Sequence, residues 1–150
     1  MNDVDKWQFR WQEAFKIVRG IGRGHIMTGS ETWKDYTISS KISIPLASAA
    51  GLILRSQGLK RYYSLELTSD KKLKINKMEY ELKTLKEIDF DLEFFKDYNL
   101  KFKVKGNHLQ GFVDDNLMIE VEDNENSFEQ GMIGFITENG AIQSESISIE

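Results

Sequence analysis

The chain of 150 residues has no cysteine, one proline and only two histidines. The lack of cysteine excludes disulfide bonds and thiolate metal ligands, and it is typical of a reducing compartment. No apolar run approaches the roughly 20 residues that a membrane-spanning helix needs. The opening segment, MNDVDKWQFRW, lacks the apolar stretch of a secretory signal. We therefore expect a cytoplasmic protein without a membrane partner.

Charges of both signs are mixed along the chain, with 20 Lys and Arg against 24 Asp and Glu and a net charge of −4. A nucleic-acid partner calls for a basic face, so we expect none. The apolar fraction of 40% is typical of a globular protein, and the length suits one domain with a real core. We treat residues 1–150 as a single domain, either independent or part of a longer protein.

Alternation of apolar and polar residues recurs along the chain, whereas helical periodicity does not. Residues 36–44 (YTISSKISI) and 98–106 (YNLKFKVKG) alternate most clearly, and Pro45 ends the first run, where a missing N–H is tolerable. Turn-forming stretches such as SQGLK, TSDKK, VDDN and TENG separate the runs. Ten to twelve short strands indicate an all-β antiparallel sandwich of the jelly-roll type. The stretch WQFRWQEAF fits either a strand or a short helix.

The stretch DFDLE places Asp89, Asp91 and Glu93 on one side of a potential strand. It resembles the alternating acids of jelly-roll glucanases, and a retaining glycosidase needs two carboxyl groups about 5–5.5 Å apart. The run continues into FFKDY, which is typical of a loop, so a solvated acidic connection is the simpler interpretation. We predict no catalytic residue, and a glycoside hydrolase remains the alternative.

Three further motifs have a simple explanation. The glycine-rich GIGRGH (residues 20–25) resembles a phosphate loop but no helix follows it, so we expect a bend between strands. His25 and His108 lack the partners of a metal site or triad and should lie on the surface. The acidic residues 120–129 lack EF-hand spacing, so a solvated loop is favoured over a calcium site. We predict no metal and no cofactor.

Residues 51–67 (GLILRSQGLKRYYSLEL) read as two strands joined by a turn. Alternation directs the leucines and Tyr63 inward and four polar side chains to the opposite face, and the strands should be neighbours. Such a face suits a sugar, because an aromatic ring stacks on C–H groups while polar groups bond hydroxyls. An exposed ion pair of Arg55 with Glu66, worth under about 1 kcal/mol, is the simpler alternative.

Each predicted ligand-binding residue has a stated role. Tyr62 would stack on the sugar, Arg55 and Gln57 would bond hydroxyls or a negatively charged substituent, and Glu66 would orient the arginine or accept from a hydroxyl. Trp33 and Lys41 are placed at the rim of the site. The full set is Trp33, Lys41, Arg55, Gln57, Tyr62 and Glu66.

These segments carry a resemblance that covers the chain from about Trp7 to Ile149. WKDYT (33–37), GLILRSQGLKRYY (51–63), residues 98–114 and GMIGF (131–135) together resemble a concanavalin A-like lectin or glucanase sandwich domain. The closest likeness is to the domain appended C-terminally to bacterial ADP-ribosylglycohydrolase-family proteins. Two residues depart from the pattern, since Asp115 stands where glycine often follows the aspartate of the hairpin and Glu66 is acidic where a neutral residue is usual.

The resemblance implies a sandwich that binds glycan or helps to dock a substrate. The hydrolase chemistry of that family belongs to a helical metal-binding domain that this chain lacks, so an associated enzyme domain is the implied partner. We expect a non-enzymatic carbohydrate-binding module with its ligand on the concave sheet, which would raise the local substrate concentration for an attached enzyme. A protein-interaction or structural accessory domain is the second alternative.

Overall fold

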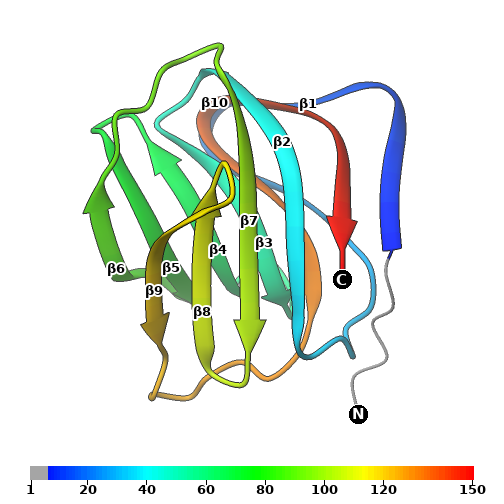
Figure 1. The fold of residues 1–150 in the computed structure, drawn as a ribbon, viewed down its shortest axis with the longest axis vertical. Helices are drawn as coiled ribbons and strands as arrows, with labels where there is room; N and C mark the ends of the chain where they lie inside the picture. Colours follow the sequence, from blue (N-terminus) through cyan, green and yellow to red (C-terminus); the bar gives the residue numbers. More distant parts are fainter. Residues whose placement is uncertain (1–6) are drawn as a thin grey trace.

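The computed structural model describes the backbone of residues 7–150 and the side chains of residues 23, 25–44, 47–140, 142, 144 and 147–150. This part of the chain forms ten antiparallel strands and no helix (Figure 1). The strands are β1 (Trp7–Thr28), β2 (Tyr36–Leu46), β3 (Ala49–Ser56), β4 (Arg61–Thr68), β5 (Lys72–Glu79), β6 (Glu81–Asp89), β7 (Asp97–Lys105), β8 (His108–Val113), β9 (Asn116–Glu122) and β10 (Met132–Ile149).

One hydrogen-bonded path, β6-β5-β4-β3-β10-β2-β7-β8-β9, folds into the two layers of a sandwich (Figure 1). Residues 132–138 of β10 pair with β3, whereas residues 141–149 of the same strand pair with β2. β1 follows β10 along both halves. The β4 layer therefore contains β3 to β6 with the first half of β10, and the β7 layer contains β2 and β7 to β9 with its second half.

β1 passes from one layer to the other within the glycine-rich stretch. Its pairing with β10 shifts register between Arg19 and Arg23, where GIGRGH begins. Glycine tolerates the backbone angles of such a bulge, and a bulge bends the strand. The predicted bend is confirmed, although it lies within one long strand rather than between two. The ambiguous start, WQFRWQEAF, is strand as well.

Side chains from the inward faces of both layers form the core. The predicted alternation is confirmed, because the residues expected to point inward are at most 3% exposed. The confirmed core positions are Tyr36, Ile38, Ile42, Ile44, Leu52, Leu54, Tyr63, Leu65, Leu67, Tyr98, Leu100, Phe102 and Val104. Burial of this apolar surface is the main force that joins the layers.

The opposite, outward face of the β4 layer is also largely buried near its centre. Ile53, Tyr62, Met78 and Ile136 form a second apolar cluster there. The His25 side chain from β1 packs edge-on against the Tyr62 ring, with centroids 5.2 Å apart. Alternation thus predicted the outward direction of Tyr62 correctly but not its burial.

Strand number and strand length differ in how well they were predicted. Ten strands in residues 7–150 agree with the expected ten to twelve, but β1 and β10 span 22 and 18 residues rather than five or six. β5 and β6 were missed. β6 is exposed along most of its length, so the apolar alternation that marks a half-buried strand is absent from it.

The β8–β9 hairpin carries a testable backbone strain. Asp114 and Asp115 form the two-residue turn and have φ values of 49° and 66°. A turn with two positive φ angles favours glycine at its second position. Since an L-residue loses about 1–2 kcal/mol in this region and glycine costs about 0.5–1 kcal/mol in chain entropy, Asp115→Gly should raise the free energy of unfolding by about 0.5–1 kcal/mol. Urea denaturation measures it.

The neighbouring position provides the control. Asp114→Gly relieves the same kind of strain but removes the Oδ1 atom that accepts the Asn99 N–H at 2.9 Å. Its gain should therefore be smaller than that of Asp115→Gly. Equal or lower stability of Asp115→Gly relative to the parent would contradict the prediction.

Candidate functional site

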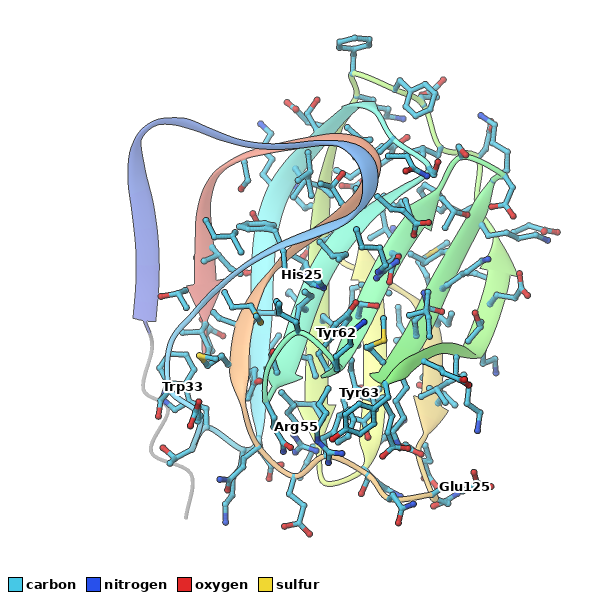
Figure 2. The ribbon with its side chains drawn as sticks, turned by 180° about the vertical axis from the view of Figure 1, so that it is seen from behind. His25, Trp33, Arg55, Tyr62, Tyr63 and Glu125 are labelled. Carbon is cyan, nitrogen blue, oxygen red and sulfur yellow. The ribbon has the colours of Figure 1, made fainter. Side chains whose placement is uncertain are left out.

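Polar side chains from four strands meet on the outward face of the β4 layer. Arg23 and His25 come from β1, Glu138 from β10, Tyr62, Ser64 and Glu66 from β4, and Asn76 from β5; we call these seven residues the outward cluster. Figure 2 shows His25 and Tyr62 near the middle of this face. On the intervening strand β3, the residues paired with Thr68 and Glu66 are Ala49 and Gly51. Small side chains there leave room for the arginine to reach across.

Arg23 is the centre of the outward cluster. Its Nη1 and Nη2 donate to the two carboxylate oxygens of Glu66 at 3.1 and 2.8 Å, and Nη1 also donates to Glu138 Oε2 at 2.8 Å. Nε and Nη2 both donate to Tyr62 Oη, at 3.2 and 3.0 Å. All five N–H groups are therefore used, and the arginine–carboxylate pairing is bidentate and fixed in direction.

Glu66 is a carboxylate with 1% of its side chain exposed. Ser64 Oγ and Asn76 Nδ2 also donate to it, the second at 3.0 Å. Burial acts to raise the pKa of Glu66, but the Arg23 hydrogen bond and charge outweigh burial and lower the pKa. Asn76 Oδ1 is buried and accepts no hydrogen bond from the residues that the structure describes. The cluster thus holds an ionised carboxylate beside an unpaired acceptor.

His25 and Tyr62 share a hydrogen bond at the edge of the cluster. His25 Nε2 lies 3.3 Å from Tyr62 Oη. Burial, and then the charge of Arg23, lower the pKa of His25. Burial is also the main cause that raises the pKa of Tyr62. The imidazole therefore stays neutral more readily here than in water.

The His25 shift predicts a pH dependence of stability. Between the lowered folded-state pKa and the unfolded value of 6.5, the unfolded chain binds more protons, so stability falls as the pH drops through this window. His25→Gln, which keeps a hydrogen-bonding side chain but cannot titrate, should reduce that slope. Urea titrations at a series of pH values between 7 and 5 measure it. An unchanged slope would contradict the assignment to His25.

A second polar site lies at one end of the sandwich. This end pocket has a volume of about 610 Å³ and is lined by Lys34, Asp35, Arg55, Gly106, Asn107, Ser127 and Glu129. Figure 2 shows Arg55 and Tyr63 at this end, away from His25. The lining comes from the segment before β2, the end of β3, the β7–β8 turn and the segment between β9 and β10.

Arg55 does not share a face with Tyr62 and Glu66, so that part of the prediction is wrong. Its φ of 48° breaks the alternation of β3, and the pairing with β10 shifts register beside it. The side chain turns to the sandwich end, with 2% exposed. The expected Arg55–Glu66 pair is also wrong, because Arg55 pairs with Asp35 at 3.0 Å.

Gln57 leaves the predicted face too. It lies exposed in the β3–β4 turn, where Oε1 accepts from Arg61 Nε at 3.0 Å and Nε2 donates to the Gln130 carbonyl at 3.1 Å. Tyr62 and Glu66 do point to one face, as predicted. The stacking role of Tyr62 is wrong in this geometry, because its ring is fully buried and offers no free face.

The two rim residues lie elsewhere. Trp33 is half-buried and packs edge-on against Tyr36, with centroids 6.3 Å apart. Lys41 lies on the outward face of the other layer and is 67% exposed, 3.5 Å from Asp97. Neither reaches the outward cluster. A ligand role for Trp33, Lys41 and Gln57 stays a prediction.

Sequence reasoning did not name five members of the cluster as site residues, namely Arg23, His25, Ser64, Asn76 and Glu138. His25, predicted on the surface, is half-buried, whereas His108 is 39% exposed as expected. One signal was available, since Arg23 and His25 in RGH are two residues apart and share a face in any strand. Their contact with β4 depends on the strand order of the sheet, which the sequence alone does not reveal.

The acidic stretches behave differently from each other. Asp89, Asp91 and Glu93 are 89%, 89% and 61% exposed and pair with lysines, which confirms a solvated connection. In residues 120–129, Asp123 is buried instead, 2.7 Å from Lys77 Nζ. Lys77 also donates to the backbone carbonyls of residues 125 and 126. An ammonium group therefore takes the oxygens that a bound cation would use.

The described residues contain neither a metal-binding cluster nor a membrane-spanning helix. No three His, Asp or Glu side chains in this part of the chain gather where they could hold a metal ion. The same residues include no helix long and apolar enough to span a bilayer.

Solved structures with the same architecture place the chain in a fold class. No protein-family model and no curated protein matches it. The carbohydrate-binding module CBM66 from Bacillus subtilis is 22% identical, with 88% of this chain and 84% of that chain covered and a TM-score of 0.80. Caenorhabditis elegans galectin LEC-6 is 14% identical, with 90% and 95% covered and a TM-score of 0.65. A native glycosidic hydrolase is 6% identical, with 100% and 97% covered and a TM-score of 0.68.

These likenesses and the strand order confirm the predicted fold. The chain is an antiparallel β-sandwich of the jelly-roll, concanavalin A-like type. Binding modules and hydrolases both use this architecture, so function has to be argued from the site.

Proposed function

We propose that the protein is a non-catalytic carbohydrate-binding module whose ligand lies on the outward face of the β4 layer. The carrying observation is the fully hydrogen-bonded Arg23–Glu66 pair, which is held on a face turned away from the main core. Removing two charges from water costs several kcal/mol per ion (order of magnitude), so such a pair is weak evidence of a purely stabilising role. Clusters that shift pKa values in this way are enriched at functional sites.

Three side chains around the Arg23–Glu66 pair are suited to the recognition of hydroxyl groups. Glu138 is 32% exposed, and one of its carboxylate oxygens accepts from no donor among the described residues. His25 is half-buried, as is Lys74, which lies opposite Glu66 on β5. They provide an acceptor, an imidazole and an ammonium donor, and the hydrogen bonds that hold Glu138 and His25 lower the entropy lost on binding. The names of two structural neighbours, a carbohydrate-binding module and a galectin, agree with a sugar ligand.

The electrostatics of this face argue against Glu66 as the acid of a glycoside hydrolase. Glu66 and Glu138 both accept from Nη1 of Arg23, so they are close to one another. Hydrolysis needs one carboxyl group that keeps its proton near neutral pH. The lowered pKa of Glu66 is the opposite of that requirement.

We further propose that this module works beside an enzyme domain in the cytoplasm. The resemblance to the domain appended to ADP-ribosylglycohydrolase-family proteins supports such an association. The module would then hold the enzyme near a sugar-containing substrate by raising its effective concentration.

A glycan array tests the proposal with the parent and three variants. We expect the parent to bind, Glu138→Ala to lose most of the signal and Lys41→Ala, on the other layer, to keep it. Glu138 is partly exposed, so its removal should leave the fold intact, which circular dichroism checks. Binding that survives Glu138→Ala and His25→Ala would overturn the location, and binding lost only in Lys41→Ala would move it to the β7 layer. A parent that binds no glycan would favour a protein-interaction domain.

A further inference from the structure

The end pocket is lined by unused hydrogen-bonding groups, unlike the saturated arginine of the outward cluster. Arg55 Nε donates to the Lys34 carbonyl at 3.0 Å, and Nη1 donates to the carbonyls of Gly106 and Phe128. Nη2 donates to Asp35 Oδ1 at 3.0 Å. Four of the five guanidinium N–H groups are thereby used. The fifth has no acceptor among the described residues, on a side chain that is 98% buried and lines the pocket.

Four more lining residues have polar groups without a partner among the described residues. Within the described part of the chain, the Lys34 ammonium, the Ser127 hydroxyl and the Glu129 carboxylate form no hydrogen bond or ion pair. Asn107 uses its amide nitrogen for Asp123 and Asn124, which leaves its Oδ1 as an acceptor. The pocket therefore presents donors and acceptors in nearly equal measure.

The charges of the lining define the class of ligand. Lys34 and Arg55 contribute two positive charges, and Asp35 and Glu129 contribute two negative charges. An anion would meet the two carboxylates and a cation would meet the lysine and arginine, so neither is favoured overall. An uncharged molecule with many hydroxyl groups can use both kinds of partner.

The pocket is also held in shape before any ligand arrives. Arg55 ties together the segment before β2, the β7–β8 turn and the segment after β9. Asp35 Oδ1 also accepts from the Gly106 N–H at 2.9 Å, which links the segment before β2 directly to the β7–β8 turn. The volume of about 610 Å³ lies within the range of roughly 300–1,000 Å³ of small-molecule sites.

We propose that the end pocket is a second binding site, specific for an uncharged sugar residue and independent of the outward cluster. It does not rest on the function proposed above, because no residue is shared between the two sites. The fifth Arg55 N–H, Ser127 and Lys34 donate to sugar hydroxyls, and Glu129 and Asn107 accept from them. Two sites on one module allow a branched or long glycan to be held at two points, which raises avidity.

A nuclear magnetic resonance titration of the ¹⁵N-labelled chain tests this proposal. The probes are glucose, galactose, mannose and fructose, with glucose 6-phosphate as the charged comparison. We expect saturable shifts of the Gly106, Asn107 and Ser127 amides with at least one neutral sugar and weaker binding of the phosphate. Ser127→Ala and Glu129→Ala should each weaken binding several-fold to tenfold, the size of one lost hydrogen bond.

Glu138→Ala is the matched control, since it alters the outward cluster and should leave these shifts unchanged. Loss of the pocket shifts in Glu138→Ala would overturn the independence of the two sites. Absence of saturable shifts at the pocket with all four sugars, unchanged affinity in both pocket variants, or tighter binding of glucose 6-phosphate than of glucose would overturn the second site. Failure here leaves the glycan-array result untouched, so the two proposals can fail separately.

Discussion

Replacing Asp123 by alanine is expected to lower the free energy of unfolding by about 3–5 kcal/mol, the usual cost of leaving a buried charge unpaired. Asp123 and Lys77 are each only 4% exposed, with 2.7 Å between Oδ2 and Nζ. Tyr63 Oη donates to the same carboxylate at 2.5 Å and accepts from the Phe128 N–H at 3.0 Å. The substitution therefore leaves the buried Lys77 ammonium group without its carboxylate partner. It also loosens the segment that leads to β10. Urea denaturation followed by tryptophan fluorescence measures it.

A double variant separates the lost pairing from simple loss of packing. Lys77→Met with Asp123→Leu removes both charges and keeps apolar volume, so it should regain much of the stability that Asp123→Ala loses. The Asp123 carboxylate has a lowered pKa because the Lys77 and Tyr63 hydrogen bonds outweigh the effect of burial. Asp123→Ala should therefore lose less stability at acid pH than at neutral pH. A cost below about 1 kcal/mol, typical of an exposed pair, would contradict this account.

Arg55→Lys is expected to destabilise the protein almost as much as Arg55→Ala, by about 3 kcal/mol or more. The guanidinium fork reaches acceptors on three separate segments, and an ammonium group cannot point to all of them at once. Backbone carbonyls of residues 34, 106 and 128 would be left buried with fewer donors. Thermal and urea denaturation measure the loss, and amide hydrogen exchange of residues 106 and 131 reports where the structure loosens.

An exposed arginine of the same hairpin is the control. Arg61 pairs with Glu79 at 3.8 Å with 36% of its side chain exposed, so Arg61→Lys should cost under about 1 kcal/mol. Similar stability of the Arg55→Lys variant and the parent would show that charge alone, rather than the fork geometry, holds the sandwich end.

Much of the fold could be predicted because strand burial leaves a period of two in the sequence. Residues 36–44 and 98–104 alternate so regularly that their inward faces were assigned residue by residue, and all lie in the core. β6 was missed because an exposed edge strand lacks that pattern. The long β1 and β10 were read as shorter pieces, since passage between layers interrupts the alternation by register shifts.

The site was harder to predict than the fold for two physical reasons. Tyr62 and Glu66 were placed on the correct face because β4 keeps its alternation throughout. Arg55 was misplaced, because one residue with φ of 48° redirects a side chain and composition does not reveal it. Arg23, the true partner of Glu66, lies 43 residues away in the chain, and only the strand order brings them together.

The central position of β10 has a consequence for how the chain is made. β10 lies between β3 and β2, so eight of the nine earlier strands in the described chain form two separate ribbons until residues 132–149 are available. The ninth, β1, waits for its partner β10. Each ribbon has an open edge toward the missing strand, and open edges invite pairing with other chains. Pairs such as Trp7 with Ile149 join the two extremes of the described chain, a high contact order that slows folding. A growing chain on the ribosome is therefore most exposed to aggregation just before β10 emerges.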